Sequence, residues 1–295
     1  MNFLQKLIDK IFKIDVWQIF ISNSSVDEFL NTKGKSIKKN YFSIKNNSKS
    51  FFADPFLLSA HKNEFSLFVE DFSFYSGAKI SLLNYQKKNL KLKKLIAGRH
   101  FSYPFNIKNR KKTFLFPEMI EENRNKLYIL NNSKITNNIN YLLGYKVVDP
   151  TIFKNKDLYW LLCSLSGKNL NENLNLYLFY SKQLNGNWIS HQKNPIYKRN
   201  LNARGAGPII QHKGKFYRPS QSNLHDNYGS ALVINELKVI NKKNFIEKKI
   251  FKIKPFNNFE GIHHISYKNN FFAYDQKKTI YSIFKPLYYL LKFLR

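Results

Sequence analysis

The sequence has 295 residues, of which 43% are hydrophobic and 16% aromatic, so it can form a core and is not wholly disordered. Its formal net charge of +30 reflects either a lysine- and asparagine-rich composition or an anionic partner. A nucleic-acid partner is not expected, because no zinc-finger spacing, RNP motif, P-loop or GxGxxG occurs, and the single Cys163 excludes an internal disulfide framework.

The N-terminal segment predicts an amphipathic helix rather than a signal peptide. Apolar residues recur at helical spacing over residues 3–12, and Lys6, Asp9 and Lys10 interrupt every candidate apolar run. We expect this helix and a lead-in strand to occupy residues 1–40, with the helix packed on the main domain.

Five related units follow. Each begins with small or polar residues, the entry residues, and continues as an apolar strand, a Lys/Asn turn and an aromatic strand. They comprise residues 51–71, 101–118, 147–164, 206–222 and, more loosely, 260–275. Four units carry a proline at the same place, namely Pro55, Pro104, Pro150 and Pro208. One histidine of the His263-His264 pair takes this place in the fifth unit. The prolines lie 49, 46 and 58 residues apart, a spacing that indicates the blades of a propeller.

The repeat therefore predicts an all-β fold, a five-bladed β-propeller over residues 41–276, with short amphipathic helices at the N- and C-termini. The alternative is a β-sandwich with coincidental Asp-Pro pairs. A closed ring is favoured because it leaves few exposed strand edges. Residues between the units, such as 79–95, are expected to form the outer strands of each blade.

The segment 277–295 predicts a basic amphipathic tail. Apolar residues between Ile280 and Leu294 form one face of a helix, the segment has five basic residues and no acid, and Pro286 would start or kink the helix. Such a helix can lie in an anionic membrane interface, and packing on the domain is the alternative. Neither terminal segment is long and charge-free enough to span a bilayer.

The innermost strands of a propeller line its central channel, so the entry residues of the five units should converge at one mouth of that channel. The candidate catalytic residues are the carboxylates Asp54, Glu118 and Asp149. The candidate substrate-binding residues are Glu70, His100, Tyr103, Arg204, Arg218, Gln221, Glu260, His263 and His264.

These residues also have structural interpretations. An aspartate before proline often accepts hydrogen bonds from backbone N–H groups at a strand start, and Glu118 fits a salt bridge as well as a pocket. Glu70 and Asp71 are adjacent, so only one of them can face the channel. Arg218-Pro-Ser-Gln221 fits recognition of an anion or of sugar hydroxyls. Neither a metal ion nor a cofactor is expected, because no HxH or HExxH spacing and no nucleotide-binding motif occurs.

Several of these motifs resemble known carbohydrate-active propellers. Phe-Ala-Asp54-Pro resembles the first blade of family 43 glycoside hydrolases. FFADPF, FSYPF with FPE, VDPTIF, RGAGPII with FYRPSQ, YGSALVI and EGIHH resemble, over residues 40–275, the propeller portion of glucosamine inositolphosphorylceramide transferase-type proteins. The hydrolase resemblance implies that Asp54 is a general base and Asp149 the aspartate that tunes pKa. The general acid departs from that family, because Glu118 lies between the two aspartates and Glu260 lies on the last blade.

Together these features predict a glycosyltransferase of surface-polysaccharide or glycolipid assembly, peripheral at the cytoplasmic face of the membrane. It would use a phosphate-activated sugar donor and a glycan acceptor. Asp54 or Asp149 would activate the acceptor hydroxyl, and Arg204 and Arg218 would hold the donor phosphate. A furanosidase-like glycoside hydrolase and a non-catalytic glycan-binding propeller are the alternatives, because the fold alone does not separate them.

Overall fold

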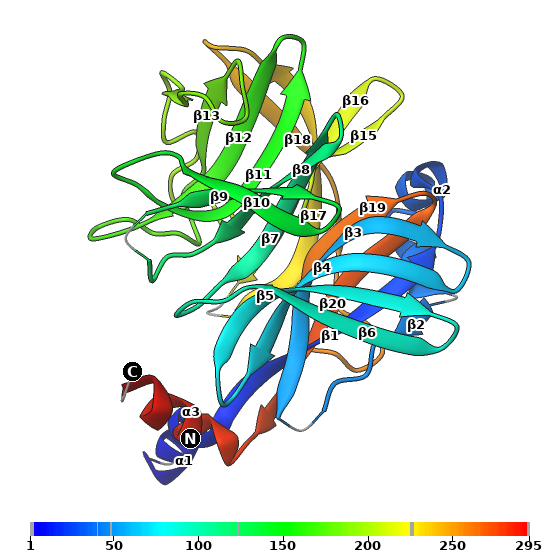
Figure 1. Ribbon diagram of the computed structural model, residues 1–295, viewed down its shortest axis with the longest axis vertical. Coiled ribbons are helices and arrows are strands. Elements are labelled where there is room, and N and C mark those ends of the chain that lie inside the picture. The colour runs from blue at the N-terminus through cyan, green and yellow to red at the C-terminus, as the bar shows by residue number, and fades with distance from the viewer. Residues whose placement is uncertain (1–2, 40, 48, 123, 225–226, 294–295) are drawn as a thin grey trace.

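The computed structural model describes residues 3–39, 41–47, 49–122, 124–224 and 227–293. Within them the chain forms a five-bladed β-propeller of four-stranded antiparallel sheets, as the repeat predicts (Figure 1).

Four blades are formed by consecutive strands, with the innermost strand first. Blade one has β3 (Ser50–His61), β4 (Glu64–Ser73), β5 (Gly77–Gln86) and β6 (Asn89–Ile96). Blade two has β7 (Ser102–Asn109), β8 (Lys112–Glu118), β9 (Lys126–Asn131) and β10 (Lys134–Asn140). Blade three has β11 (Lys146–Asn155), β12 (Leu158–Ser166), β13 (Tyr177–Ser181) and β14 (Ile189–Ser190). Blade four has β15 (Ile210–His212), β16 (Lys215–Leu224), β17 (Asn227–Ile240) and β18 (Phe245–Ile253).

The fifth blade closes the ring with strands from both ends of the chain. Its order is β19 (Gly261–Lys268), β20 (Phe271–Tyr281), β1 (Lys13–Asn23) and β2 (Tyr41–Ser43). β1 pairs antiparallel with β20 along its whole length. The division expected at residue 40 therefore does not follow the sheets, since the lead-in strand is the third strand of this blade.

The repeated dipeptides lie at β-bulges of the inner strands. The register shifts at Asp54–Pro55 in β3, Tyr103–Pro104 in β7, Asp149–Pro150 in β11 and His263–His264 in β19. Proline fits there because a bulge interrupts the ladder and needs no N–H donor. Gly207, just before Pro208 and β15, has a φ of +125°, and an added Cβ would lie 2.0 Å from the carbonyl oxygen of Ile265. Glycine is therefore required at this position, where blade five approaches the chain that enters blade four.

Hydrophobic side chains fill the spaces between neighbouring blades. One buried cluster joins blades one to three and includes Phe56, Phe105 and Phe116. A second joins blades four and five and includes Phe272, together with Phe29 of the short helix α2 (Val26–Asn31) that precedes the 3-10 turn η1 (Lys35–Lys38). These clusters hold the blades, and hence the inner bulges, in fixed relative positions.

Helices α1 (Phe3–Phe12) and α3 (Phe284–Phe293) lie together at one end of the molecule, where the two termini meet (Figure 1). Lys285 Nζ joins them by donating hydrogen bonds to the backbone carbonyls of Lys10 and Lys13, each at 2.7 Å. Pro286 occupies the first turn of α3, where its missing N–H costs no helical hydrogen bond. Among the described residues, no helix is long and apolar enough to cross a bilayer.

Candidate functional site

A cavity of about 290 Å³, here called the axial pocket, opens where the inner bulges meet. Seven of the predicted site residues line it, namely Asp54, Glu70, His100, Glu118, Asp149, Arg204 and His263. Aromatic and other side chains complete the wall: Ile14, Trp17, Phe51, Phe72, Ser102, Tyr228, Tyr288 and Tyr289. Groups from all five blades and from α3 therefore converge on one cavity.

Carboxylates at and next to the pocket join neighbouring blades at three of the five junctions. Asp54 Oδ2 accepts a hydrogen bond from the N–H of Tyr103 at 3.0 Å, and Glu118 Oε2 accepts one from the N–H of Asp149 at 3.1 Å. Asp275 Oδ2 in turn accepts the N–H of Asp54 at 2.9 Å. Bulge amides have no partner in the strand ladder, so these carboxylates satisfy buried donors. In Asp54 and Glu118 one carboxylate oxygen thus has a structural role and the other remains for the pocket, whereas both oxygens of Asp275 accept hydrogen bonds.

Arg204 lies at the pocket wall between two carboxylates. Its Nε donates to Asp149 Oδ2 at 2.6 Å, its Nη2 lies 3.8 Å from Glu118 Oε2, and its Nη1 donates to Asn173 Oδ1 at 2.9 Å. The guanidinium also lies over the ring of Tyr228, at 4.9 Å from the centroid. Its charge is therefore largely compensated by the protein, so it is a weaker anion site than the sequence predicted.

Arg218 does not enter the axial pocket, contrary to the sequence-based expectation. Its guanidinium is buried and binds the carboxylate of Glu247 in a bidentate pair at 2.7 and 2.6 Å. It also donates to the backbone carbonyls of Asn202 and Ala203, both at 3.1 Å. A buried charge requires a partner, and the acid on β18 supplies it. The two-arginine phosphate clamp is consequently not formed, and Arg218 instead holds the segment that leads into Arg204.

Gln221 also lies behind the pocket wall. Its side-chain amide donates to the carbonyl of Gly205 at 2.8 Å and to Asp149 Oδ2 at 3.3 Å, and its N–H donates to the carbonyl of Arg204 at 3.0 Å. The Arg218-Pro-Ser-Gln221 motif is therefore placed to position Arg204 rather than to contact a ligand.

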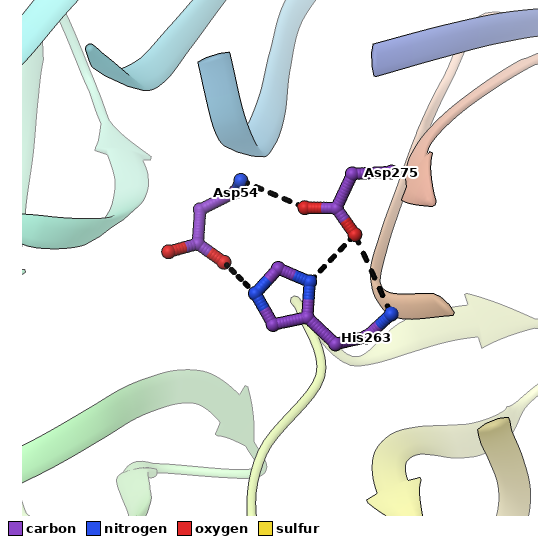
Figure 2. A group of neighbouring side chains, drawn as sticks. All are labelled: Asp54, His263 and Asp275. Atoms are coloured by element: carbon purple, nitrogen blue, oxygen red, sulfur yellow. Dashed lines mark hydrogen bonds and ion pairs between the residues drawn. The ribbon is translucent and has the colours of Figure 1, made fainter. Parts of the chain in front are cut away.

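His263 is held between two aspartates (Figure 2). Its Nδ1 lies 2.6 Å from Asp275 Oδ1, and its Nε2 lies 3.4 Å from Asp54 Oδ1. Its ring stacks on the indole of Trp17, with the ring centroids 3.7 Å apart. Burial opposes the charged form, but Asp275 and then Asp54 outweigh it and raise the pKa of His263 above its usual value. The imidazole therefore presents a fixed N–H to the pocket carboxylate.

The pKa values of the pocket carboxyls are raised, chiefly by burial. Burial raises the pKa of Asp54 to about 7 against the opposing effect of His263, and the pKa of Asp149 to about 7 against that of Arg204. Burial, reinforced by Asp54 and Glu118, raises the pKa of Glu70 well above its usual value. Near neutral pH the pocket thus holds both protonated and ionised carboxyls, which can donate and accept protons.

Two further predicted residues form the floor below the pocket. The Tyr103 hydroxyl shares a hydrogen bond with Thr151 Oγ1 at 2.8 Å and accepts the N–H of Gly207 at 2.9 Å. His264 is fully buried against aromatic rings, and burial lowers its pKa to about 3. Both side chains fill the propeller axis and are not available to a ligand in the axial pocket.

Glu260 likewise lies outside the axial pocket. It is exposed, precedes β19, and accepts a hydrogen bond from the N–H of Thr279 at 3.0 Å. It lines a separate, wider cavity of about 700 Å³, here called the outer cavity, which shares Ile14 and Tyr289 with the axial pocket. Glu260 is therefore not placed to act as an acid in the axial pocket.

Several pocket residues carry no repeat signal in the sequence. Trp17 lies on the N-terminal strand, and Tyr288 and Tyr289 lie on the C-terminal helix, outside the five units. Tyr228 belongs to the YGSALVI motif, and the sequence does not mark it as a pocket residue. Asp275 ends the fifth unit and does not line the pocket, but it bonds His263 and Asp54, which do. Their position depends on ring closure, which the motifs alone do not specify.

Asp54, His263 and Asp275 also form a cluster whose potential ligand atoms lie within 4.8 Å of one another. The oxygens of Asp275 already accept hydrogen bonds from His263 Nδ1 and from the N–H groups of Asp54 and His264. That leaves Asp54 and His263 Nε2 to contact an ion. The geometry therefore fits a hydrogen-bonded Asp-His-Asp chain better than a metal site.

Sequence comparison matches residues 36–268 to the family described as glucosamine inositolphosphorylceramide transferase 1, N-terminal. Curated relatives of that name from Oryza sativa subspecies japonica and indica are each 27% identical over 152 residues. The match spans 50% of this chain but only 20% of each relative's length.

The fold is similar to that of solved glycoside hydrolases. An exo-1,5-α-L-arabinanase from a bovine ruminal metagenomic library has a TM-score of 0.52 at 15% identity, covering 78% of this chain and 92% of the other. A family 43 β-xylosidase/α-arabinofuranosidase from a compost microbial metagenome has a TM-score of 0.54 at 11% identity, covering 80% and 92%. At these identities the similarity extends to the propeller fold alone.

Proposed function

Because this chain belongs to the family defined by the N-terminal region of glucosamine inositolphosphorylceramide transferase 1, we propose that its axial pocket is the sugar-binding site of a glycosyltransferase. The transferase would act in surface-polysaccharide or glycolipid assembly. The observation that carries the proposal is the convergence of four carboxyl groups, Arg204 and His263 on one cavity with aromatic walls. Sugars are bound by such combinations, in which hydroxyls meet paired donors and acceptors and ring faces meet apolar surface.

Asp54 is the best candidate for the general base. One of its oxygens is held by the N–H of Tyr103, while the other lies toward the pocket and His263. A pKa of about 7 places this carboxyl near the optimum for proton transfer at neutral pH. Asp54 would take the proton of the acceptor hydroxyl while the oxygen of that hydroxyl attacks the anomeric carbon of the donor. The donor phosphate would leave with the electrons of the broken C–O bond. Asp149, paired with Arg204, would hold the wall in place.

The donor phosphate would lie in the outer cavity, beside Lys13 and Lys285. Within the axial pocket the one lining guanidinium of the described residues is already paired. The outer cavity adjoins the axial pocket through Ile14 and Tyr289, and three lysines and three acids line it: Lys13, Lys277, Lys285, Asp9, Asp15 and Glu260. Lys277 is paired with Asp15, whereas Lys285 Nζ donates to backbone carbonyls and Lys13 lies 3.8 Å from Asp9. A sugar in the axial pocket and its phosphate among these lysines would span the two cavities.

A glycoside hydrolase is the second candidate, favoured by the excess of carboxyl groups over cationic groups in the axial pocket. Asp54 would then activate water, and Glu118, whose pKa burial raises despite Arg204, would protonate the leaving oxygen. Inverting hydrolases of this kind hold their carboxyls about 6.5–9.5 Å apart to accommodate the water.

Turnover assays distinguish these candidates. Wild type, Asp54→Asn and Asp71→Asn are incubated with labelled nucleotide sugars or polyprenyl-phosphate sugars plus glycan acceptors, and separately with aryl furanosides. Asp71 is a matched control because it is equally buried but bonds Ser81 and Lys79, away from the pocket. We expect acceptor-dependent transfer by wild type and Asp71→Asn, and a loss of about 10²–10⁴ in Asp54→Asn. Cleavage of aryl furanosides without use of phosphorylated donors would contradict the transferase.

A further inference from the structure

Helices α1 and α3, with the adjoining end of β20, form an apolar surface that no other part of the described chain covers. We call residues 3–13 and 277–293 the helix pair. Ten of the 22 exposed large apolar side chains of the described residues lie in it. Phe293 and Ile283 are the most exposed of these 22 side chains, at 88% and 76%, and Leu4 and Leu290 of the helix pair are exposed to 59% and 56%. Concentration of this kind on a small part of the surface marks an interaction site.

The helix pair is also strongly basic. Its two segments contain seven lysines and one acid, Asp9, which is itself bonded to Tyr281 and Lys13. Lys10 and Lys278 are exposed, whereas Lys277 is paired with Asp15 and Lys292 with Glu121. Lysine is depleted at the centres of protein interfaces, and two copies meeting here would bring like charges together. Anionic lipid headgroups complement both features at once, with lysines at the headgroups and apolar side chains below them.

One side of α3 packs on the propeller, which holds the helix in a fixed orientation. Tyr288 packs against Phe72 with ring centroids 5.2 Å apart, and Phe284 packs near Phe74 at 6.0 Å. Lys292 is paired with Glu121 of blade two at 2.7 Å. Leu290 and Phe293 of the same helix remain exposed, at 56% and 88%.

The helix pair borders the entrance of the axial pocket. Tyr288 and Tyr289 of α3 line that pocket, as does Ile14 of β1, and Lys13 and Lys285 line the outer cavity. Any surface that receives the helix pair must therefore lie next to the entrance.

We propose that the helix pair docks the protein onto an anionic bilayer surface, with Leu4, Leu290 and Phe293 inserted into the interface. The entrance of the axial pocket then opens at the membrane surface. The docking does not depend on the proposed catalytic function, because it is measured with vesicles in the absence of sugar.

The test uses co-sedimentation of the full chain with phosphatidylcholine vesicles and with vesicles containing added phosphatidylglycerol. We expect binding to the anionic vesicles that weakens as salt is raised. The double variant Leu290→Ser/Phe293→Ser should bind at least about tenfold more weakly, since two apolar anchors are lost. The matched control is Leu143→Ser/Ile189→Ser, which removes side chains of comparable exposure, 67% and 53%, from other parts of the propeller. It should bind like wild type.

The depth to which α3 inserts into the bilayer is measured with the variant Phe293→Trp. Brominated lipids should quench the fluorescence of the introduced tryptophan. Absence of binding to anionic vesicles would overturn the proposal. An equal loss of vesicle binding in the two double variants would also overturn it. A concentration-dependent dimer that Leu290→Ser/Phe293→Ser abolishes, without vesicle binding by wild type, would assign the surface to a second copy instead.

Discussion

Asp54→Asn should make the folded protein more stable at alkaline pH while removing its activity. Burial raises the pKa of Asp54 from its usual 3.8 to about 7. The folded protein therefore keeps a proton that the unfolded chain releases in this interval. The stability that this proton contributes is fully present below about pH 4 and is lost as the pH rises through about 7.

The magnitude follows from the size of the shift. A rise from 3.8 to about 7 is roughly three pKa units, or on the order of 4 kcal/mol at about 1.36 kcal/mol per unit. Asparagine carries no charge, and its amide oxygen can still accept the N–H of Tyr103, now 3.0 Å from Asp54 Oδ2. The variant should therefore exceed wild type by up to about 4 kcal/mol near pH 8 and match it near pH 4.

Urea unfolding of both proteins near pH 4 and pH 8 measures this difference. Asp71→Asn is the control, because it removes a carboxylate that lies 3.4 Å from Lys79 Nζ and accepts a hydrogen bond from Ser81. That variant should gain no stability at alkaline pH. If Asp54→Asn showed the same stability relative to wild type at both pH values, Asp54 would not be a buried carboxyl with a raised pKa.

Three further changes probe the surroundings of the axial pocket. Arg218→Met should lower the free energy of unfolding by about 3–5 kcal/mol, because it leaves Glu247 buried without its partner, and an unchanged urea midpoint would refute this. Asp275→Asn should lower the pKa of His263, followed by NMR titration, since the carboxylate at 2.6 Å stabilises the imidazolium, and an unaltered titration would contradict the Asp-His-Asp chain. Lys13→Gln should weaken binding of nucleotide sugars but not of neutral sugars in calorimetry, and equal weakening of both would exclude a phosphate in the outer cavity.

The inner strands could be predicted from the sequence because their bulges have a local signature. Asp54–Pro55 and Asp149–Pro150 place a residue that tolerates positive φ before a residue that needs no N–H, and bulges recur at the equivalent place in four of the five inner strands. A periodic local signal of this kind specifies both the blade count and the residues that face the axis. Asp54 and Asp149 occupy equivalent places in this signal, and both line the axial pocket.

The remaining pocket components depend on pairings between distant segments. β1 has no counterpart in the repeat, so neither its place in blade five nor the stacking of Trp17 on His263 has a sequence signal. Arg218 follows the repeat pattern, but its orientation is set by Glu247, 29 residues further along the chain. Glu260 precedes its strand by one residue, so it misses the bulge that turns His263 toward the pocket.

A crystal structure of the protein soaked with a nucleotide sugar tests the central claim most directly. We expect a sugar ring in the axial pocket, with one of its hydroxyls within hydrogen-bonding distance of Asp54. We expect the phosphate groups beside Lys13 and Lys285 in the outer cavity. A sugar bound on another surface, with the axial pocket free of sugar at saturating concentration, would contradict it.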